Sequence, residues 1–308
     1  MTAVVLALPE NDRLANRIGA LLDLDVSDVV VHRFPDGEAR VRVNRSVAGK
    51  AVVLTATLDR SDQKVLPLLF TAATARDLGA SSVGLVAPYL AYMRQDRRFE
   101  AGEGVSARHF ARLLSGALDW LVTVDPHLHR TAQLEDLYTI PARAATTAPL
   151  LAEWIAMNVE RPVVIGPDAE SAQWVETVAN RIKAPHAVLS KRRSGDDTVA
   201  IKLPDLSACV GHQPVLVDDI IASGATMIEA TRLLRRAGWR APICLAVHAV
   251  FAGKSYALLQ EAGAAKIVTC NTITHPSNEI DVSRLVAIAV EQALQSSGLS
   301  APTLEAVR

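Results

Sequence analysis

Two carboxylates, Asp218 and Asp219, separate an apolar run from a turn of small residues in the stretch VLVDDIIASGAT, 215–226. The small residues of the turn allow successive backbone N–H groups to face one point, and a helix that begins near its end adds a positive dipole. The hydroxyls of Ser223 and Thr226 are further donors. Carboxylates beside a bound phosphate can accept hydrogen bonds from the hydroxyls of an attached sugar, or from water molecules around Mg²⁺. The stretch therefore predicts an anion site that suits a sugar phosphate.

A purely structural explanation competes for the same residues. Thr226 and Glu229 have the spacing of a capping box at a helix start, and strands often end in aspartate. The capping box accounts for Thr226, but it does not account for the acid pair or for the run Ala-Ser-Gly-Ala. The anion site is therefore the favoured interpretation.

The elements that must position these residues follow from the hydrophobic pattern. Short continuous apolar runs are typical of parallel strands buried on both faces, and they occur at 3–8, 29–32, 51–55, 82–87, 120–124, 162–166, 186–190, 214–218, 243–250 and 266–270. The run 39–43 alternates and is expected in an exposed hairpin or flap. Helical spacing of apolar residues occurs at 11–22, 64–79, 106–117, 171–182, 227–238 and 283–294. This alternation predicts an α/β doubly wound architecture, in which ligands bind beyond the carboxyl ends of the strands.

Length and charge limit the classes of partner. The 308 residues suffice for two domains, and the periodicity lapses near 139–150, where two prolines occur. A short similarity between 121–127 and 215–221 is compatible with a duplication of the two halves or with chance. With 32 basic and 33 acidic side chains, the chain gives no electrostatic argument for nucleic acid or for a membrane surface, and no apolar stretch approaches the roughly 20 residues of a membrane span.

Cysteine usage and the N-terminal segment bear on the compartment. Cys209, Cys244 and Cys270 are far apart and lack a CxxC pattern, as expected for buried thiols in a reducing compartment. No basic region precedes the first apolar run, so no signal peptide is expected. These features predict a cytoplasmic protein.

Five further motifs occur in a fixed order with the opening stretch. They are HRFPDGEARVRV (32–43), PYLAYMRQDRRF (88–99), TVDPHLHR (123–130), GPDAES (166–171) and LSKRRSGDD (189–197). Taken singly, RQDRR could be a solvated charged turn, PDGE a plain hairpin turn, and KRRSGDD a basic surface turn. Taken together with 215–226, they resemble the ribose-phosphate diphosphokinases, or PRPP synthetases, of the type I phosphoribosyltransferase fold. The Pro-His form at 126–127 is closer to the archaeal-type branch of that family.

The resemblance implies two phosphoribosyltransferase-like domains, each a mainly parallel sheet flanked by helices. Residues 1–143 would carry an ATP-binding flap, and 144–308 would carry a ribose 5-phosphate loop. The implied activity is the transfer of the diphosphoryl group of Mg-ATP to the 1-hydroxyl of ribose 5-phosphate, giving PRPP and AMP. The implied assembly is a homo-oligomer based on dimers.

The resemblance also assigns roles to individual residues. Those implied for ATP are Phe34, Asp36, Glu38, Arg94, Gln95, Asp96 and His127, where Phe34 can stack on adenine and Arg94 can donate to base or phosphates. Those implied for ribose 5-phosphate are Asp218, Asp219, Ala222, Ser223, Gly224, Ala225 and Thr226. His127 and Asp168 would serve Mg²⁺, directly or through water. Lys191 and Arg193 would be catalytic, because they can neutralise charge on the transferring phosphates.

Three residues depart from the family pattern. Glu170 adds negative charge where pyrophosphate would approach, and Ala222 and Ala225 replace residues that commonly shape the phosphate loop. These departures motivate two alternatives: a non-catalytic regulatory subunit that retains the fold, or a diphosphokinase acting on another pentose phosphate. A phosphoribosyltransferase that transfers PRPP to a base is disfavoured, because it needs only one such domain and no ATP flap.

Overall fold

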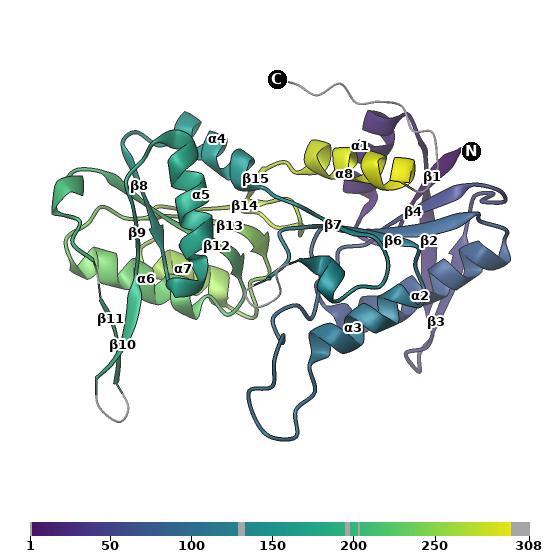
Figure 1. The fold of residues 1–308 in the computed structure, drawn as a ribbon, viewed down its shortest axis with the longest axis horizontal. Helices are drawn as coiled ribbons and strands as arrows, with labels where there is room; N and C mark the ends of the chain where they lie inside the picture. The colour runs from purple at the N-terminus through teal and green to yellow at the C-terminus, as the bar shows by residue number, and fades with distance from the viewer. Residues whose placement is uncertain (1, 129–132, 195–197, 203, 297–308) are drawn as a thin grey trace. The chain divides into compact units, whose positions relative to one another are not determined.

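The computed structural model describes residues 2–128, 133–194, 198–202 and 204–296, and within 191–194 and 198–202 it describes only the backbone. The chain forms two compact units (Figure 1). Unit 1 contains the residues up to Thr146 together with the C-terminal helix that begins at Ser283, and unit 2 contains Thr147–Val282. In the part of the chain that the structure describes, no helix combines the length and the apolar character needed to cross a membrane.

Unit 1 is built on a seven-stranded sheet of order β3-β2-β1-β4-β5-β6-β7, parallel except for β3. The strands are β1 (Ala3–Ala7), β2 (Asp25–Arg33), β3 (Ala39–Val43), β4 (Ala51–Thr55), β5 (Ser82–Ala87), β6 (Trp120–Val124) and β7 (Ala142–Ala145). The helices are α1 (Asp12–Leu22), α2 (Ser61–Asp77), α3 (Ser106–Ser115), α8 (Ser283–Ser296) and the 3-10 helix η1 (Leu134–Asp136). The central strand β4 is buried along its whole length, as its continuous apolar sequence predicts.

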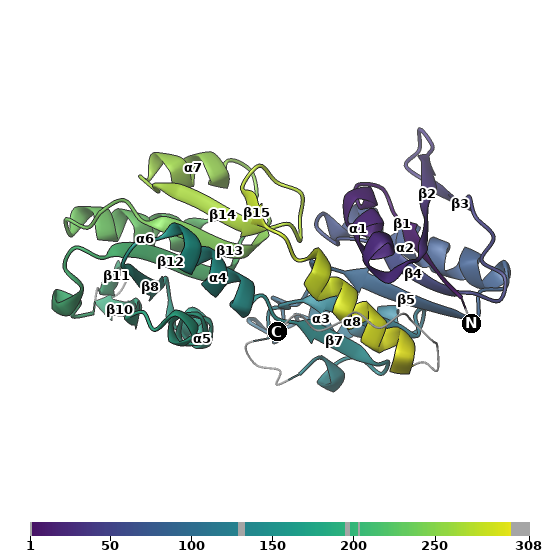
Figure 2. The same ribbon diagram turned by 90° about the horizontal axis from the view of Figure 1, so that it is seen from above.

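The helices of unit 1 follow their apolar spacing. In α1, Ala15, Ile18 and Leu22 recur at three- and four-residue steps and are completely buried. Helix α8, yellow in Figure 2, packs beside α1 and against β6 and β7, although it follows unit 2 in the chain. Unit 1 therefore includes a helix that follows the whole of unit 2 in the sequence.

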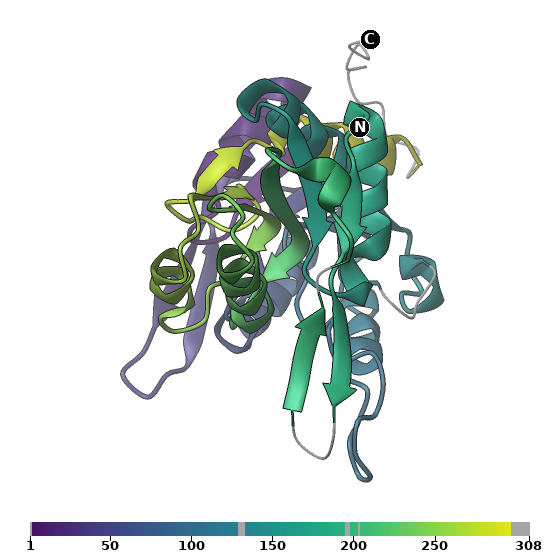
Figure 3. The same ribbon diagram turned by 90° about the vertical axis from the view of Figure 1, so that its left-hand side faces the viewer.

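Unit 2 is built on a six-stranded parallel sheet of order β15-β14-β13-β12-β8-β9. Its strands are β8 (Pro162–Gly166), β9 (His186–Val188), β12 (Gln213–Ile221), β13 (Ile243–Ala249), β14 (Lys266–Cys270) and β15 (Asn278–Ile280). Its helices are α4 (Ala148–Asn158), α5 (Ala172–Ile182), α6 (Ala225–Arg236), α7 (Ser255–Glu261), η2 (Ala169–Ser171) and η3 (Ser207–Cys209). A separate hairpin of β10 (Ser190–Ser194) and β11 (Thr198–Lys202) extends from this unit (Figure 3).

The two sheets share one topology. In unit 1 the chain runs from β1 through α1 to β2 on one side, and from β4 through α2 to β5 on the other. In unit 2 it runs from β8 through α5 to β9, and from β12 through α6 to β13. The connections therefore diverge between β1 and β4 and again between β8 and β12, which makes these two places the topological switch points where α/β sheets bind ligands.

This correspondence corrects one detail of the sequence comparison. The stretches 121–127 and 215–221 belong to β6 and β12, whereas the counterpart of β12 in unit 1 is β4. The repeated topology is that of a duplication, but the two stretches do not occupy equivalent places in it. Their similarity reflects only that each is a buried strand ending near an aspartate.

Candidate functional site

The switch point of unit 2 gathers three carboxylates. Asp168 follows β8, while Asp218 and Asp219 lie in the last part of β12, which continues to Ile221 rather than ending at Asp218. Burial raises the pKa of Asp218 well above its usual value, and repulsion from Asp219 and Asp168 raises it further. The backbone N–H of Asp219 donates to Asp218 Oδ1 at 3.0 Å. The structure thus brings the acid pair and Asp168, which are 50 residues apart, into one electrostatic group.

The turn after β12 begins helix α6 in the manner of an anion site. Gly224 precedes the helix with φ 73°, a left-handed conformation that costs glycine no Cβ clash. The first N–H groups of any helix lack intrahelical acceptors, and they face the end of β12 here because strand and helix are joined by only three residues, 222–224. Ser223 Oγ accepts the N–H of Ala225 at 3.5 Å. This geometry can place a phosphate on backbone donors.

Two questions raised by the sequence are resolved at this turn. The capping box of Thr226 and Glu229 does not form, because the left-handed Gly224 starts the helix earlier and Thr226 lies inside the first turn. Ala225 is the first residue of α6, so its backbone is helical and does not need glycine. The small side chain at position 225 is thus compatible with the turn.

A brace from the loop after β13 holds the turn. The N–H of Phe251 donates to the Ile221 carbonyl at 2.9 Å, and the N–H of Ala252 donates to the Ala222 carbonyl at 2.9 Å. The hydroxyl of the buried Ser255 donates to the same Ala222 carbonyl at 3.2 Å. These bonds engage the carbonyl groups of the turn, so that its N–H side is the side available to a ligand.

Sequence reasoning missed this brace. Aromatic rings of Phe251, Tyr256 and His275 support it, with ring centroids 4.5 to 5.1 Å apart. Burial lowers the pKa of His275, so the ring stays neutral among its aromatic neighbours. The one available signal was that the loop after β13 must reach the same sheet edge as the loop after β12.

Asp168 is engaged in local structure as well as in the acid group. Its Oδ1 accepts the N–H of Glu170 at 3.1 Å, and its carbonyl accepts the hydroxyl of Ser171 at 2.6 Å. It is thereby the N-cap of η2. Glu170 contributes its backbone N–H to this cap, and its side chain is exposed, so the extra negative charge noted in the sequence lies on the solvent side of the loop.

The fit of these residues to Mg²⁺ is partial. Among the residues that the structure describes, no group of three or more His, Cys, Asp or Glu side chains is arranged to hold a metal ion. His127 follows β6 in unit 1, and Asp168 follows β8 in unit 2. Mg²⁺ is commonly held by one or two carboxylates together with substrate phosphates and water, and the cluster around Asp218 supplies carboxylates of that kind.

The hairpin of β2 and β3 carries Phe34, Asp36 and Glu38 at its exposed tip. The N–H of Phe34 donates to the Glu38 carbonyl at 2.9 Å, and Asp36 Oδ1 accepts the N–H of Glu38 at 3.0 Å. Phe34 is 40% exposed and contacts His32 edge to face, with centroids 4.7 Å apart. Asp36 therefore shapes the turn, and the Phe34 ring remains partly exposed, with the Arg40 guanidinium 6.0 Å above its centroid.

The segment between β5 and α3 contains Arg94, Gln95 and Asp96, which the sequence predicted to bind ATP. Gln95 Nε2 donates to the Gly104 carbonyl at 2.9 Å, and Gln95 Oε1 accepts the N–H of Ser106 at 3.1 Å, at the start of α3. Gln95 thus holds the loop against the helix, Asp96 is half-buried, and Arg94 is exposed. Of the three, Arg94 is the residue best placed to meet a solvent-borne anion.

The predicted catalytic residues lie on the β10–β11 hairpin. Lys191 pairs with Ile201 and Arg193 with Val199, so the two positions are two residues apart on one strand and share a face. Their side chains lie outside the described part of the structure. His129, the second histidine of the motif at 123–130, is likewise outside the described residues.

Comparison with known proteins identifies relatives for both parts of the chain. Residues 3–117 match the N-terminal domain of ribose phosphate pyrophosphokinase, and residues 133–286 match the phosphoribosyl transferase domain. A ribose-phosphate pyrophosphokinase of Methanopyrus kandleri is 36% identical over 290 residues, which cover 94% of this chain and 98% of that protein. One from Methanothermobacter thermautotrophicus is 32% identical over 285 residues, covering 92% and 98%.

The solved structures agree. The phosphoribosylpyrophosphate synthetase of Mycobacterium smegmatis superposes with a TM-score of 0.84 at 26% identity, covering 96% of this chain and 100% of its own. The α/β architecture predicted from the apolar runs, with two phosphoribosyltransferase-like sheets flanked by helices, is confirmed.

Proposed function

The chain belongs to the ribose-phosphate pyrophosphokinase family, an enzyme family, and on that premise we propose that it transfers the diphosphoryl group of Mg-ATP to the 1-hydroxyl of ribose 5-phosphate, giving PRPP and AMP. The observation that carries the proposal is the switch point of unit 2, where three acids lie beside a helix-start turn. Membership of the family was predicted from the order of the motifs and is confirmed.

Ribose 5-phosphate would bind at this switch point. Its phosphate would lie on the N–H groups of residues 222–226, and its ring hydroxyls would donate to Asp218 and Asp219. The raised pKa of Asp218 supports this assignment, because acids that repel one another gain stability from a ligand that brings donors or a cation.

ATP would bind through residues of unit 1. Phe34 would stack on the base, Arg94 would contact base or phosphates, and His127 would lie near the triphosphate, as the family resemblance implies. In the proposed division, residues 1–143 would carry the ATP site and 144–308 the ribose 5-phosphate site, although helix α8 (Ser283–Ser296) of the second half packs in unit 1. Glu38 and Asp96 would complete the nucleotide site, while Gln95 would act through the loop that it holds.

The chemistry requires positive charge near the transferring group. Mg²⁺ would be held by Asp168, with His127 as the further implied ligand, and when bound it neutralises charge on the phosphates. Lys191 and Arg193, two residues apart on β10, would donate to the oxygens on which charge develops as the bond to AMP breaks. The hairpin would also close over the bound substrates and exclude water while the transfer takes place.

The test uses the purified chain with ATP, ribose 5-phosphate and Mg²⁺. We expect AMP and PRPP in equal amounts, and AMP release should depend on the sugar phosphate. If both substrates bind and neither product forms, the proposal is refuted and the non-catalytic alternative is favoured, most clearly if turnover appears only with a second subunit. A panel of other pentose phosphates distinguishes the remaining alternative.

Lys191→Ala tests the catalytic assignment. Its charge should act on the transition state, so we expect kcat to fall by about 10²-fold or more while the KM for ribose 5-phosphate changes little. Lys50→Ala, which removes a lysine that follows β3 in unit 1, is the matched control and should retain activity. Equal losses in kcat and in substrate affinity for Lys191→Ala would contradict the assigned role.

We further propose a cytoplasmic homo-oligomer based on dimers, as the family resemblance implies. Cys209, Cys244 and Cys270 are buried thiols that are not joined in disulfides, as expected where thiols stay reduced. Light scattering on the full chain tests the assembly, and a monomer at micromolar concentration would contradict it.

A further inference from the structure

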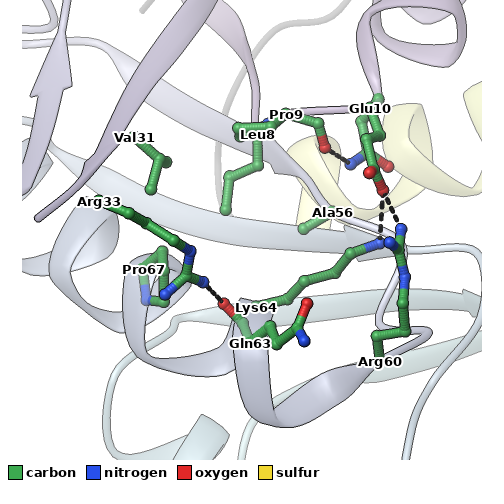
Figure 4. A pocket seen from close by; sticks show the side chains of 11 residues that line it. Leu8, Pro9, Glu10, Val31, Arg33, Ala56, Arg60, Gln63, Lys64 and Pro67 are labelled. Carbon is green, nitrogen blue, oxygen red and sulfur yellow. Dashed lines mark hydrogen bonds and ion pairs between the residues drawn. The ribbon is translucent and has the colours of Figure 1, made fainter. Parts of the chain in front are cut away.

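The switch point of unit 1 contains a pocket that no part of the proposed reaction uses. It lies at the carboxyl ends of β1, β2 and β4, beside the start of α2 (Figure 4), and its volume is about 260 Å³. Pockets for drug-sized ligands measure about 300–1,000 Å³, so this one suits a smaller molecule. Because β1 and β4 correspond to β8 and β12, the pocket is the counterpart in unit 1 of the crevice proposed for ribose 5-phosphate.

The backbone at the two sites has the same local form. Gly224, with φ 73°, precedes α6, and Arg60, with φ 51°, precedes α2. A second non-glycine residue of the pocket, Glu10, also has a left-handed backbone, with φ 71°. Such conformations are strained in non-glycine residues and persist where the surroundings enforce them. Both strained residues lie in the loops that line the pocket.

The loops are tied together across the switch point. The buried Asn11 accepts the N–H of Thr57 on its Oδ1 at 2.8 Å, and its Nδ2 donates to the Pro9 carbonyl at 2.8 Å. One side chain thus fixes the loop after β1 to the loop after β4. The pocket is therefore held open by defined contacts rather than by a chance gap between loops.

The lining combines an apolar floor with charged walls. Leu8, Val31, Ala56 and Pro67 supply the apolar part. Figure 4 shows Lys64 and Arg60 reaching Glu10 from one side and Arg33 lying on the other. A ligand with a small apolar body and a charged group matches such a lining.

Charge is unevenly distributed over the walls. Glu10 Oε2 accepts hydrogen bonds from Arg60 at 2.5 Å and from Lys64 at 3.1 Å, and Asp59 accepts one from Lys64 at 2.5 Å. Burial opposes ionisation of Glu10, but these cations hold its pKa below the usual value, so it is a carboxylate at neutral pH.

Arg33 is the third cation of the lining. Its guanidinium donates to the Gln63 carbonyl, and no carboxylate among the described residues pairs with it. With Arg60 and Lys64 matched by Glu10 and Asp59, the positive charge of Arg33 is uncompensated at the pocket.

We propose that this pocket binds a small organic phosphate monoester, with its phosphate on Arg33 and the adjacent cations and its apolar body against Leu8, Val31 and Ala56. The site differs from the ribose 5-phosphate crevice in its means of recognition: side chains supply the donors in unit 1, whereas the backbone turn supplies them in unit 2. The proposal concerns unit 1 alone and stands apart from the proposed reaction.

Calorimetric titration of the full chain with phenyl phosphate tests the proposal. Arg33→Gln should weaken binding about tenfold or more, because a charged hydrogen bond is lost. Arg13→Gln, the same change on the exposed side of α1, should leave the isotherm unchanged. Phenyl phosphate bound at residues 222–226 contributes equally to both variants and cancels in the comparison.

Two further arms give opposite signs. Glu10→Gln removes the carboxylate that faces the same cations, so it should tighten binding about threefold or more. Inorganic phosphate and phenol, the two halves of the probe, should each bind at least about tenfold more weakly than phenyl phosphate. Thermal unfolding and circular dichroism confirm that each variant is folded.

The refuting results are equally specific. The proposal is overturned if Arg33→Gln and Arg13→Gln give the same isotherm, or if Glu10→Gln weakens binding in a folded protein. It is also overturned if phenol binds as strongly as phenyl phosphate, because recognition would then be apolar. If inorganic phosphate binds as strongly as phenyl phosphate, the pocket does not recognise the organic part of the ligand, and the assignment to a phosphate monoester is overturned.

Discussion

Gly224→Ala should weaken ribose 5-phosphate binding while leaving most of the protein folded. With φ 73°, an L residue at this position costs about 1–2 kcal/mol. The added Cβ would lie 3.2 Å from Ser255 Cβ and 3.4 Å from Ile228 Cδ1, closer than side chains normally pack. Ser255 must then shift, and its hydrogen bond to the Ala222 carbonyl, worth about 1 kcal/mol, is weakened. The free energy of unfolding should therefore fall by about 2–3 kcal/mol.

The effect on binding follows from the same displacement. Moving the turn by a few tenths of an ångström misdirects the N–H groups that would hold the phosphate, and each charged hydrogen bond contributes about 1.5–3 kcal/mol. We expect the affinity for ribose 5-phosphate to fall about tenfold or more by calorimetry. Urea unfolding gives the stability of the same sample.

Gly238→Ala is the matched control. Gly238 follows the other end of α6 with φ 82°, and an added Cβ would meet nothing within 4 Å. In this variant the backbone strain alone should lower the free energy of unfolding by about 1–2 kcal/mol, and the affinity for ribose 5-phosphate should be unchanged. If both variants lose affinity equally, or if Gly224→Ala binds like the unaltered protein, the turn is not the phosphate site.

Three further outcomes are expected. Asp218→Asn should raise the stability of the ligand-free protein by about 1–2 kcal/mol at pH 8. The pKa of Asp218 is raised in the folded protein, so ionisation of Asp218 destabilises the fold as the pH increases above about 3.9, the pKa of aspartate in the unfolded chain. The gain in stability should therefore shrink towards pH 4, and the affinity for ribose 5-phosphate should fall. Tyr138→Phe should add about 1 kcal/mol in urea unfolding, because the buried Tyr138 hydroxyl has no hydrogen-bond partner among the described residues; a loss of stability would show that the hydroxyl is satisfied. Gly84→Ala should cost more than about 4 kcal/mol or prevent folding, because its Cβ would lie 1.8 Å from Trp120 Cε2, whereas Gly116→Ala, with no contact under 3.5 Å, should be nearly neutral by the same measurement.

The sequence could predict elements whose pattern is local. All eleven predicted strands correspond to strands of the structure, although 186–190 is divided between β9 and the start of β10. Helix α4 was missed because prolines and a lapse in periodicity near 139–150 indicated a boundary, whereas Pro149 occupies the first turn of α4, where proline is tolerated. The short strands β7 and β15 have too few residues to produce a pattern.

In the candidate site, too, the features that could be predicted are those formed by residues adjacent in sequence. Asp218, Asp219 and the turn after them are adjacent in sequence, so their chemistry could be read directly. The electrostatic interaction of Asp168 with Asp218, and the hydrogen bond from Ser255 to Ala222, join residues about 30 to 50 apart and depend on which strands are neighbours. The structural role of Gln95 was likewise invisible, because it depends on where α3 begins. Spacing reveals a motif, but only the sheet order reveals what supports it.

The duplicated topology places Gly224 and Arg60 at corresponding turns, one before α6 and the other before α2. Both residues precede a helix with a left-handed backbone, a conformation that costs glycine little and arginine about 1–2 kcal/mol. At Gly224, the absence of a side chain would let the proposed phosphate approach the backbone. At Arg60, the side chain forms an ion pair with Glu10, which helps to offset the strain. The two proposed anion sites would thus recognise phosphate by different means, through the backbone at Gly224 and through side chains at Arg60, and a variant that exchanged the two residues is expected to impair both.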